Sequence, residues 1–127
     1  MKFTELLRQM PDFIGGKGGD EETIIAYENA LGTRFAPDYR EYLKEIGLAC
    51  FDGKELTGIS KTSRLNVVDV TKEEREMNDG IPADFYVIEE TCYDGIVIWQ
   101  ATNGFVFKTT PNTKPQKVGR SLADFYQ

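Results

Sequence analysis

The chain has 127 residues, 40% of them hydrophobic, and its 21 acidic and 15 basic residues give a net charge of −6. This length and composition fit one folded domain, and the acidic balance disfavours direct nucleic-acid binding, which needs a basic face. The sequence contains no histidine. Histidine-based catalytic triads, histidine general acids and bases, and histidine-containing zinc sites are therefore excluded.

The two cysteines, Cys50 and Cys92, lie far apart and lack the C-x-x-C spacing of a metal or redox site. We expect both thiols to be reduced and structural, and we expect no metal and no cofactor. No apolar run approaches the roughly 20 residues that cross a bilayer. Residues 1–13 lack the pattern of a secretory signal. We therefore expect a cytoplasmic protein without membrane contacts.

Near the N-terminus, apolar residues at helical spacing predict a helix over residues 3–10. Residues 14–19 (Ile-Gly-Gly-Lys-Gly-Gly), here called the glycine-rich segment, predict a flexible joint that is too short to separate domains. A phosphate-binding loop is disfavoured because the lysine is followed by glycine rather than Ser or Thr, and no strand precedes it. We expect one domain over 1–127, with residues 1–20 forming the helix and joint and residues 21–127 the core.

Two amphipathic helices are predicted next. The acidic residues 20–22 suit the first turn of a helix over 22–31, where carboxylates meet free N–H groups and the positive end of the helix dipole. Pro37 suits the first turn of a second helix. Gly32 and Gly47 follow the two apolar stripes, and glycine readily takes the left-handed conformation that ends a helix.

Composition then shifts toward strands. Residues 55–60 and 65–70 are predicted as short strands separated by a polar turn. Thr71-Lys-Glu-Glu74 has the pattern of a capping box, in which each side chain accepts a hydrogen bond from a backbone N–H near the other. This box predicts a short helix that ends near Met77.

A meander of three antiparallel strands is predicted over 85–90, 96–101 and 105–109. Asn103-Gly104 favours a type I′ turn between the last two of these strands. The middle strand is apolar on both faces, so we expect it at the centre of the sheet with Trp99 in the core. Residues 111–117 are predicted as a loop, and Ser121 as the cap of a terminal helix.

The order of these features carries a family resemblance. The segment Glu22–Gly47 contains Leu-Gly, then Phe, then Pro-Asp-Tyr-x-x-Tyr-Leu, and the chain finishes with Ser-Leu-x-x-Phe-Tyr. Over about Glu21–Tyr126 this order resembles the SUKH superfamily, also called the Smi/Knr-like family of cell-wall regulators. The resemblance implies an α+β fold in which helices pack on a mainly antiparallel sheet. In bacteria the family consists largely of immunity proteins, which implies a non-enzymatic protein that binds and neutralises a polymorphic toxin.

Partner-binding residues are predicted at loops and strand ends, which vary without disturbing a core. The candidates are acids, together with tyrosines whose rings end in a polar tip: Asp52, Glu55, Tyr86, Glu89, Glu90, Tyr93 and Asp94. The net charge favours a basic toxin domain, such as a nuclease with a groove lined by Lys and Arg. The same charge also serves to keep a small domain soluble.

Two other functions remain open at this point. The family resemblance also allows a regulatory or scaffolding module that recruits a cellular protein. A more remote alternative is a small hydrolase that uses Glu89, Glu90 and Asp94 as catalytic carboxylates. It is disfavoured because neighbours on a strand point to opposite faces, so Glu89 and Glu90 do not line one cleft. We expect these glutamates to form a solvated strand end or an acidic rim, and we predict no catalytic residue.

Overall fold

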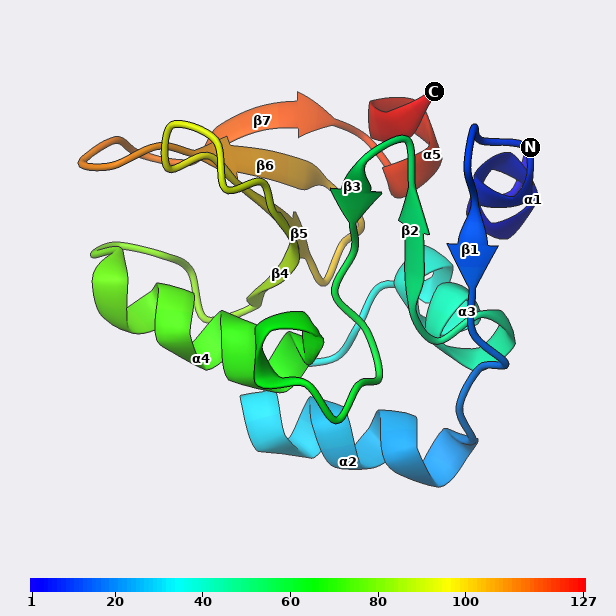
Figure 1. The fold of residues 1–127 in the computed structure, drawn as a ribbon. Coiled ribbons are helices and arrows are strands. Elements are labelled where there is room, and N and C mark those ends of the chain that lie inside the picture. Colours follow the sequence, from blue (N-terminus) through cyan, green and yellow to red (C-terminus); the bar gives the residue numbers. More distant parts are fainter.

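The computed structural model describes residues 1–127 and contains five α-helices and two antiparallel sheets (Figure 1). The helices are α1 (Phe3–Arg8), α2 (Glu21–Leu31), α3 (Pro37–Glu45), α4 (Val67–Met77) and α5 (Leu122–Tyr126). The small sheet has the order β1 (Ile14–Gly15), β2 (Ala49–Phe51) and β3 (Lys54–Glu55). The large sheet has the order β4 (Phe85–Glu90), β5 (Val97–Ala101), β6 (Val106–Thr109) and β7 (Gln116–Gly119). The predicted α+β class is confirmed, and no helix is both long and apolar enough to cross a membrane.

The helical pair forms as the sequence predicts. The Asp20 side chain accepts a hydrogen bond from the Thr23 N–H at 2.9 Å and caps α2, while Gly32 ends that helix at a φ of 71°. Pro37 lies in the first turn of α3. The carboxylate of Asp38 then accepts hydrogen bonds from the side chain of Gln100 in β5 and from the backbone N–H at the start of α5. The Pro-Asp-Tyr sequence therefore ties α3 to the large sheet and to the C-terminal helix.

The glycine-rich segment is not the flexible joint that its composition predicts. Its first two residues form β1 and pair with β2, and the backbone N–H groups of Gly16 and Gly18 donate to the carbonyls of Leu48 and Ile46. Gly18 has a φ of +82°, and a Cβ there would overlap the Lys44 carbonyl. The glycines are thus required for close backbone approach, which composition alone does not distinguish from flexibility.

We predict that Gly18→Ala destabilises the protein more than Gly53→Ala does. Both residues have positive φ, +82° and +76°, but no atom lies within 4 Å of a Cβ built on Gly53. Gly53→Ala should therefore cost only the strain of the backbone conformation, about 1 kcal/mol. Gly18→Ala adds a backbone clash and should cost roughly 2–4 kcal/mol. Equal unfolding free energies in urea would contradict the tight packing of this segment.

Helix α4 overturns two predictions from the sequence. The predicted strand over 65–70 is wrong, because Val67 begins a helix whose cap is the Asn66 side chain. Its Oδ1 accepts hydrogen bonds from the N–H groups of Val68 and Asp69 at 2.9 and 3.1 Å. The capping box at Thr71 is therefore wrong as well, since Thr71 lies inside the helix. Burial of the valines offsets the modest helix propensity of β-branched residues.

The Thr71 hydroxyl instead pairs with a backbone N–H group at the edge of the large sheet. It accepts a hydrogen bond from the Val87 N–H of β4 at 2.9 Å, and the Thr57 hydroxyl donates to the Val87 carbonyl at 2.7 Å. Arg75 of α4 donates to the Phe85 carbonyl at 3.0 Å. Side chains of α4 and of the segment after β3 thus take the place of another strand beside β4.

The predicted meander is confirmed, with β4, β5 and β6 as consecutive antiparallel neighbours. Three details differ. Ile88 is the extra residue of a bulge between Val87 and Glu89. Gly104 has a positive φ whereas Asn103 does not, so the turn is not type I′. The fourth strand, β7, was not predicted, and its first two residues fall in the loop predicted over 111–117, because its exposed side chains give no apolar alternation.

The small sheet also differs from the prediction. Only Lys54–Glu55 is extended in the region of the strand predicted over 55–60, and β2 was not predicted. Strands of two or three residues are too short to produce a periodic pattern.

Two apolar clusters lie on the opposite faces of the large sheet. The larger one joins the sheet to α1, α2, α3 and α5, and the smaller one includes Val87, Val97, Trp99 and Phe85. Trp99 is fully buried and its indole N–H donates to Thr109 at 2.9 Å, so its predicted place in the core is confirmed. In Figure 1, α2 lies below α4, and α1 and α5 bring the two chain ends to the same side.

Candidate functional site

Two adjoining pockets form a groove beside α4. The first has a volume of about 300 Å³ and the second about 900 Å³, and both are lined by Met77, Asn78 and Asn112. We call this surface the α4 groove. Its walls are the C-terminal end of α4 with the loop that follows it, the turn after β4, and the loop between β6 and β7. Phe85 and Phe107 stack with their ring centroids 4.6 Å apart and line the second pocket.

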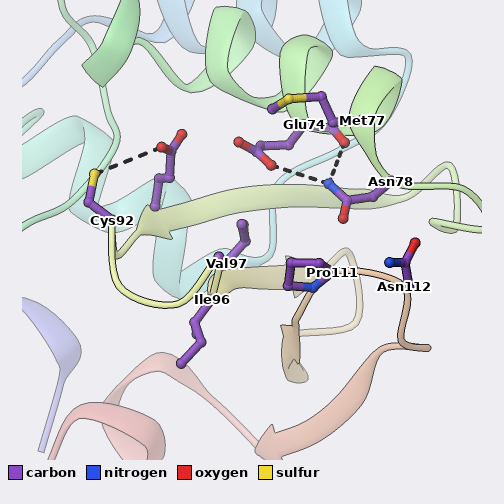
Figure 2. A pocket seen from close by; sticks show the side chains of 10 residues that line it. Glu74, Met77, Asn78, Cys92, Ile96, Val97, Pro111 and Asn112 are labelled. Carbon is purple, nitrogen blue, oxygen red and sulfur yellow. Dashed lines mark hydrogen bonds between the residues drawn. The ribbon is translucent and has the colours of Figure 1, made fainter.

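The smaller pocket has a polar side and an apolar side (Figure 2). Glu74 and Asn78 come from the α4 side, whereas Val97 and Pro111 lie on the other side, and the Ile96 side chain points away from the pocket. Gly95 has a φ of +70°, and a Cβ there would press against the Pro111 ring. The turn after β4 therefore packs directly on the loop between β6 and β7, and this contact closes one end of the pocket.

Glu74 is the most unusual polar residue of the pocket. Its side chain is buried, with only 5% of the residue exposed. Its Oε1 accepts a hydrogen bond from the Asn78 amide at 3.2 Å, whereas Oε2 accepts none from the protein and is open to the pocket. The Glu90 carboxyl lies within hydrogen-bonding reach. Burial, and then this neighbouring carboxyl, raise the pKa of Glu74 to about 7.

No base of the protein neutralises the two carboxyls, since neither Glu74 nor Glu90 is part of an ion pair. Arg75 follows Glu74 in the sequence but donates to the carbonyls of Leu31, Ala83 and Phe85 instead. The wider groove adds two acids and one base: Asp79, Asp84 and Lys114. The α4 groove is therefore acidic, and neither the buried Glu74 nor the exposed Glu90 is paired with a cation.

The structure divides the predicted contact residues between two places. Glu90 lines the α4 groove, and Tyr93 and Asp94 lie exposed in the turn at its end. Asp52 and Glu89 line a separate pocket beside α5. Glu55 is exposed but pairs with Arg64 through two hydrogen bonds of 2.9 and 3.1 Å.

Glu89 and Glu90 do point to opposite faces, as their adjacent positions on a strand predict. Glu90 contributes to the α4 groove, whereas Glu89 accepts a hydrogen bond from the Tyr126 hydroxyl at 2.7 Å on the other face. Glu89 is only 6% exposed, so its assignment to a solvated strand end or rim is wrong. Burial raises the pKa of Glu89. Its role is to bind α5 to the sheet.

The prediction that Tyr86 lies at a surface is also wrong. Tyr86 is fully buried, and its ring packs against Phe35 and Tyr39. Its hydroxyl donates to Gln100 Oε1 at 2.6 Å and accepts from the Ala36 N–H at 2.8 Å. Flanking residues along a strand do not reveal which face is covered, because here both faces of β4 are buried.

Reasoning from the sequence missed Glu74, Asn78 and the loop between β6 and β7. The capping box predicts a helix that starts at Thr71 instead of Val67, and this start gives no sign that Glu74 is buried. With α4 started at Val67, the buried stripe Val67, Val70, Thr71 and Glu74 has the i, i+3, i+4, i+7 spacing of one helix face. That spacing was the available signal for Glu74.

Comparison with protein families matches residues 3–114 to the family described as SUKH_5, SMI1-KNR4 cell-wall. The match covers most of the chain. This protein belongs to the SUKH family. The matched residues include β4, β5, β6, α4 and every residue of the α4 groove except Pro115. A search of curated proteins finds no match for the sequence.

We predict that Tyr86→Phe destabilises this SUKH protein by about 1–3 kcal/mol, because it leaves the buried Ala36 N–H and Gln100 carbonyl without partners. The matched control is Tyr93→Phe, which removes a hydroxyl from an exposed ring and should change the unfolding free energy by less than about 0.5 kcal/mol. Denaturant unfolding of both variants checks this. A neutral Tyr86→Phe would contradict the buried network.

Glu74 makes the stability of this SUKH protein depend on pH. Its pKa is about 7 in the folded protein against an ordinary value of 4.5, so the folded state holds the proton more tightly. Stability should fall as pH rises through this window, and the cost is fully present above pH 7. Glu74→Gln removes the charge and should stabilise the protein at pH 8 by roughly 1 kcal/mol, a value reduced for solvent in the open pocket. At pH 4 the gain should disappear.

Glu76→Gln provides the control for this prediction, because Glu76 is an exposed residue of the same helix. Its melting temperature should follow that of the unmodified protein between pH 4 and pH 8. If Glu74→Gln also follows the unmodified protein, the carboxyl of Glu74 is ionised at no cost and the description of the pocket fails.

Proposed function

We propose that this protein is an immunity protein that binds a toxin domain through the α4 groove and blocks its active site or the path of its substrate. Membership of the SUKH family supports the role, since SUKH proteins are generally immunity proteins. The observation that carries the location is the uncompensated carboxyl pair of Glu74 and Glu90 in an acidic groove. Inhibition would be stoichiometric and would need no catalytic residue.

The partner that fits this surface is a basic protein. Acids outnumber bases in the groove, and the whole chain carries a net charge of −6. Complementary charge speeds the encounter of two proteins, and aromatic residues at an interface hold the complex. Tyr93 is 70% exposed and lies beside the acidic groove, so we propose Tyr93, Glu90 and Asp94 as contacts. Asp52 and Glu55 remain predicted contacts outside the groove.

The paired carboxyls also bring the hydrolase alternative back into consideration, because a raised pKa is typical of a general acid. Their spacing argues against a glycosidase, the carboxylate hydrolase with a defined separation. Catalytic carboxyls of glycosidases lie about 5–9.5 Å apart so that the substrate fits between them. Glu74 and Glu90 lie within hydrogen-bonding reach of each other. We therefore keep the non-enzymatic proposal.

The proposal predicts an association rate that depends on charge. The partner is captured from the native cell, identified by mass spectrometry and purified, and its association is measured by stopped flow. Raising the salt from 0.05 to 0.5 M should slow association by about tenfold or more, while dissociation changes little, because salt screens steering. The double substitution Glu90→Lys with Asp94→Lys should slow association similarly at low salt.

A matched control carries the same change of net charge at another place. Glu5→Lys with Glu22→Lys reverses two exposed acids of α1 and α2 that form no ion pair. This variant should retain most of the association rate. If both double variants slow association equally, or neither does, recognition does not use the α4 groove.

Co-expression separates immunity from the regulatory alternative. An immunity protein should restore growth of cells that express the captured partner, and a toxin gene should lie beside its own gene. A captured partner that is harmless to cells would favour a regulatory or scaffolding module instead.

A further inference from the structure

We propose that the smaller pocket of the α4 groove receives one arginine side chain of the partner protein, whose guanidinium bridges the carboxylates of Glu74 and Glu90. This inference rests on the proposed function for the source of the arginine. It deepens that function by stating which chemical group the groove recognises and where. Its support has three parts: a carboxyl of a buried residue without a cation, the shape of the pocket and the position of the two carboxyls.

The first part is the missing partner of Glu74. A carboxyl on a residue that is 95% buried normally has its oxygens paired when it is ionised, because burial of a charge without a partner is costly. Here one oxygen accepts from the Asn78 amide, while the other accepts no hydrogen bond from the protein, is open to the pocket and has a second carboxyl as its neighbour. Arg75 is engaged with three backbone carbonyls and does not turn toward the pocket. A cation that enters the pocket would supply the absent partner.

The second part is the lining of the pocket, whose volume is about 300 Å³. The Glu74 carboxyl lies on one side, and Val97 and the ring of Pro111 form an apolar side opposite (Figure 2). A long basic side chain has the same two characters, since its methylene stem covers apolar surface while its charged head meets polar groups. Met77 is 62% exposed and forms part of the rim, where it would exclude water from a bound side chain.

The third part favours arginine over lysine. Glu74 and Glu90 come from two elements, α4 and β4, and the hydrogen bond between Thr71 and Val87 holds the backbones that carry them side by side. A planar guanidinium presents several N–H donors in a fixed fork and bridges two acceptors, whereas an ammonium is a compact and strongly hydrated point charge. Guanidinium also loses less hydration when it enters a half-enclosed site.

The test uses a probe that requires no partner protein. The ¹⁵N-labelled protein is titrated with N-acetyl-arginine amide, and the backbone signals of Cys92 and Gly95 and the side-chain amide of Asn78 are followed by NMR. All three residues line the pocket. We expect saturable shifts at these signals with a Kd of about 1–10 mM, as suits a single side chain. N-acetyl-citrulline amide has nearly the same shape without the charge and should produce at most a tenth of the affinity.

Two variants provide the controls. Glu74→Gln with Glu90→Gln keeps the shape of the pocket and removes its charge, and should weaken arginine binding by about tenfold or more. Glu73→Gln with Glu76→Gln removes the same charge from the exposed face of α4 and should bind arginine as the unmodified protein does. The spectrum of each variant without probe establishes that it is folded.

Several results would overturn the proposal: equal shifts with citrulline, shifts confined to other surfaces, or equal binding to both double variants. N-acetyl-lysine amide binding as tightly as the arginine probe would overturn the choice of guanidinium. The outcome is separate from that of the immunity role. If the pocket does not bind the arginine probe, the arginine proposal is wrong, and the toxin experiments still test the immunity role. If the pocket binds arginine but the protein protects no cell, the arginine site is supported and the toxin is wrong as its partner.

Discussion

The free edge of β4 is the constraint on which the rest of the structure depends. β4 is the outermost strand of the large sheet, and its unpaired backbone groups need partners. Thr71 accepts from the Val87 N–H, and Thr57 donates to the Val87 carbonyl. Helix α4 therefore lies along the strand as a substitute for a neighbouring strand. An isolated hydroxyl contributes little, but these bonds are buried, and losing either would leave an unpaired backbone group.

The same contact creates the site. Glu74 follows Thr71 by three residues, about one helical turn, so the bond from Thr71 to Val87 brings the Glu74 carboxyl to the end of β4 beside Glu90. Arg75 then fixes the chain leading into β4 through the carbonyls of Ala83 and Phe85. Two like charges in a half-enclosed pocket cost stability. Such a cost is typical of a functional site and is hard to explain as a feature of the fold alone.

Local signals were enough for part of the fold. Asp20 and Gly32 bracket α2, Pro37 begins α3, and apolar runs mark β4, β5 and β6. These features depend on residues close in sequence. The start of α4 was missed because valines favour strands in isolation, and only tertiary burial outweighs that preference. The glycine-rich segment was misjudged for the same reason, since the backbone that its glycines approach lies far along the chain.

The site was less predictable than the fold. Glu90, Tyr93 and Asp94 do lie together at the end of the groove, as their place in a turn indicates. Tyr86 and Glu89 are buried because both faces of β4 are covered, which no pattern within the strand reveals. The burial of Glu74 can be predicted only when α4 is started at Val67, because that start puts Glu74 on the buried face of the helix.

Hydrogen–deuterium exchange of the protein alone and bound to its purified partner tests the central claim most directly. The account predicts that binding slows exchange in three segments that form the α4 groove, residues 74–80, 90–96 and 110–115. It predicts little change in the glycine-rich segment, which lies outside the groove. Protection confined to β1, β2 and α1, with the three groove segments unchanged, would contradict the account.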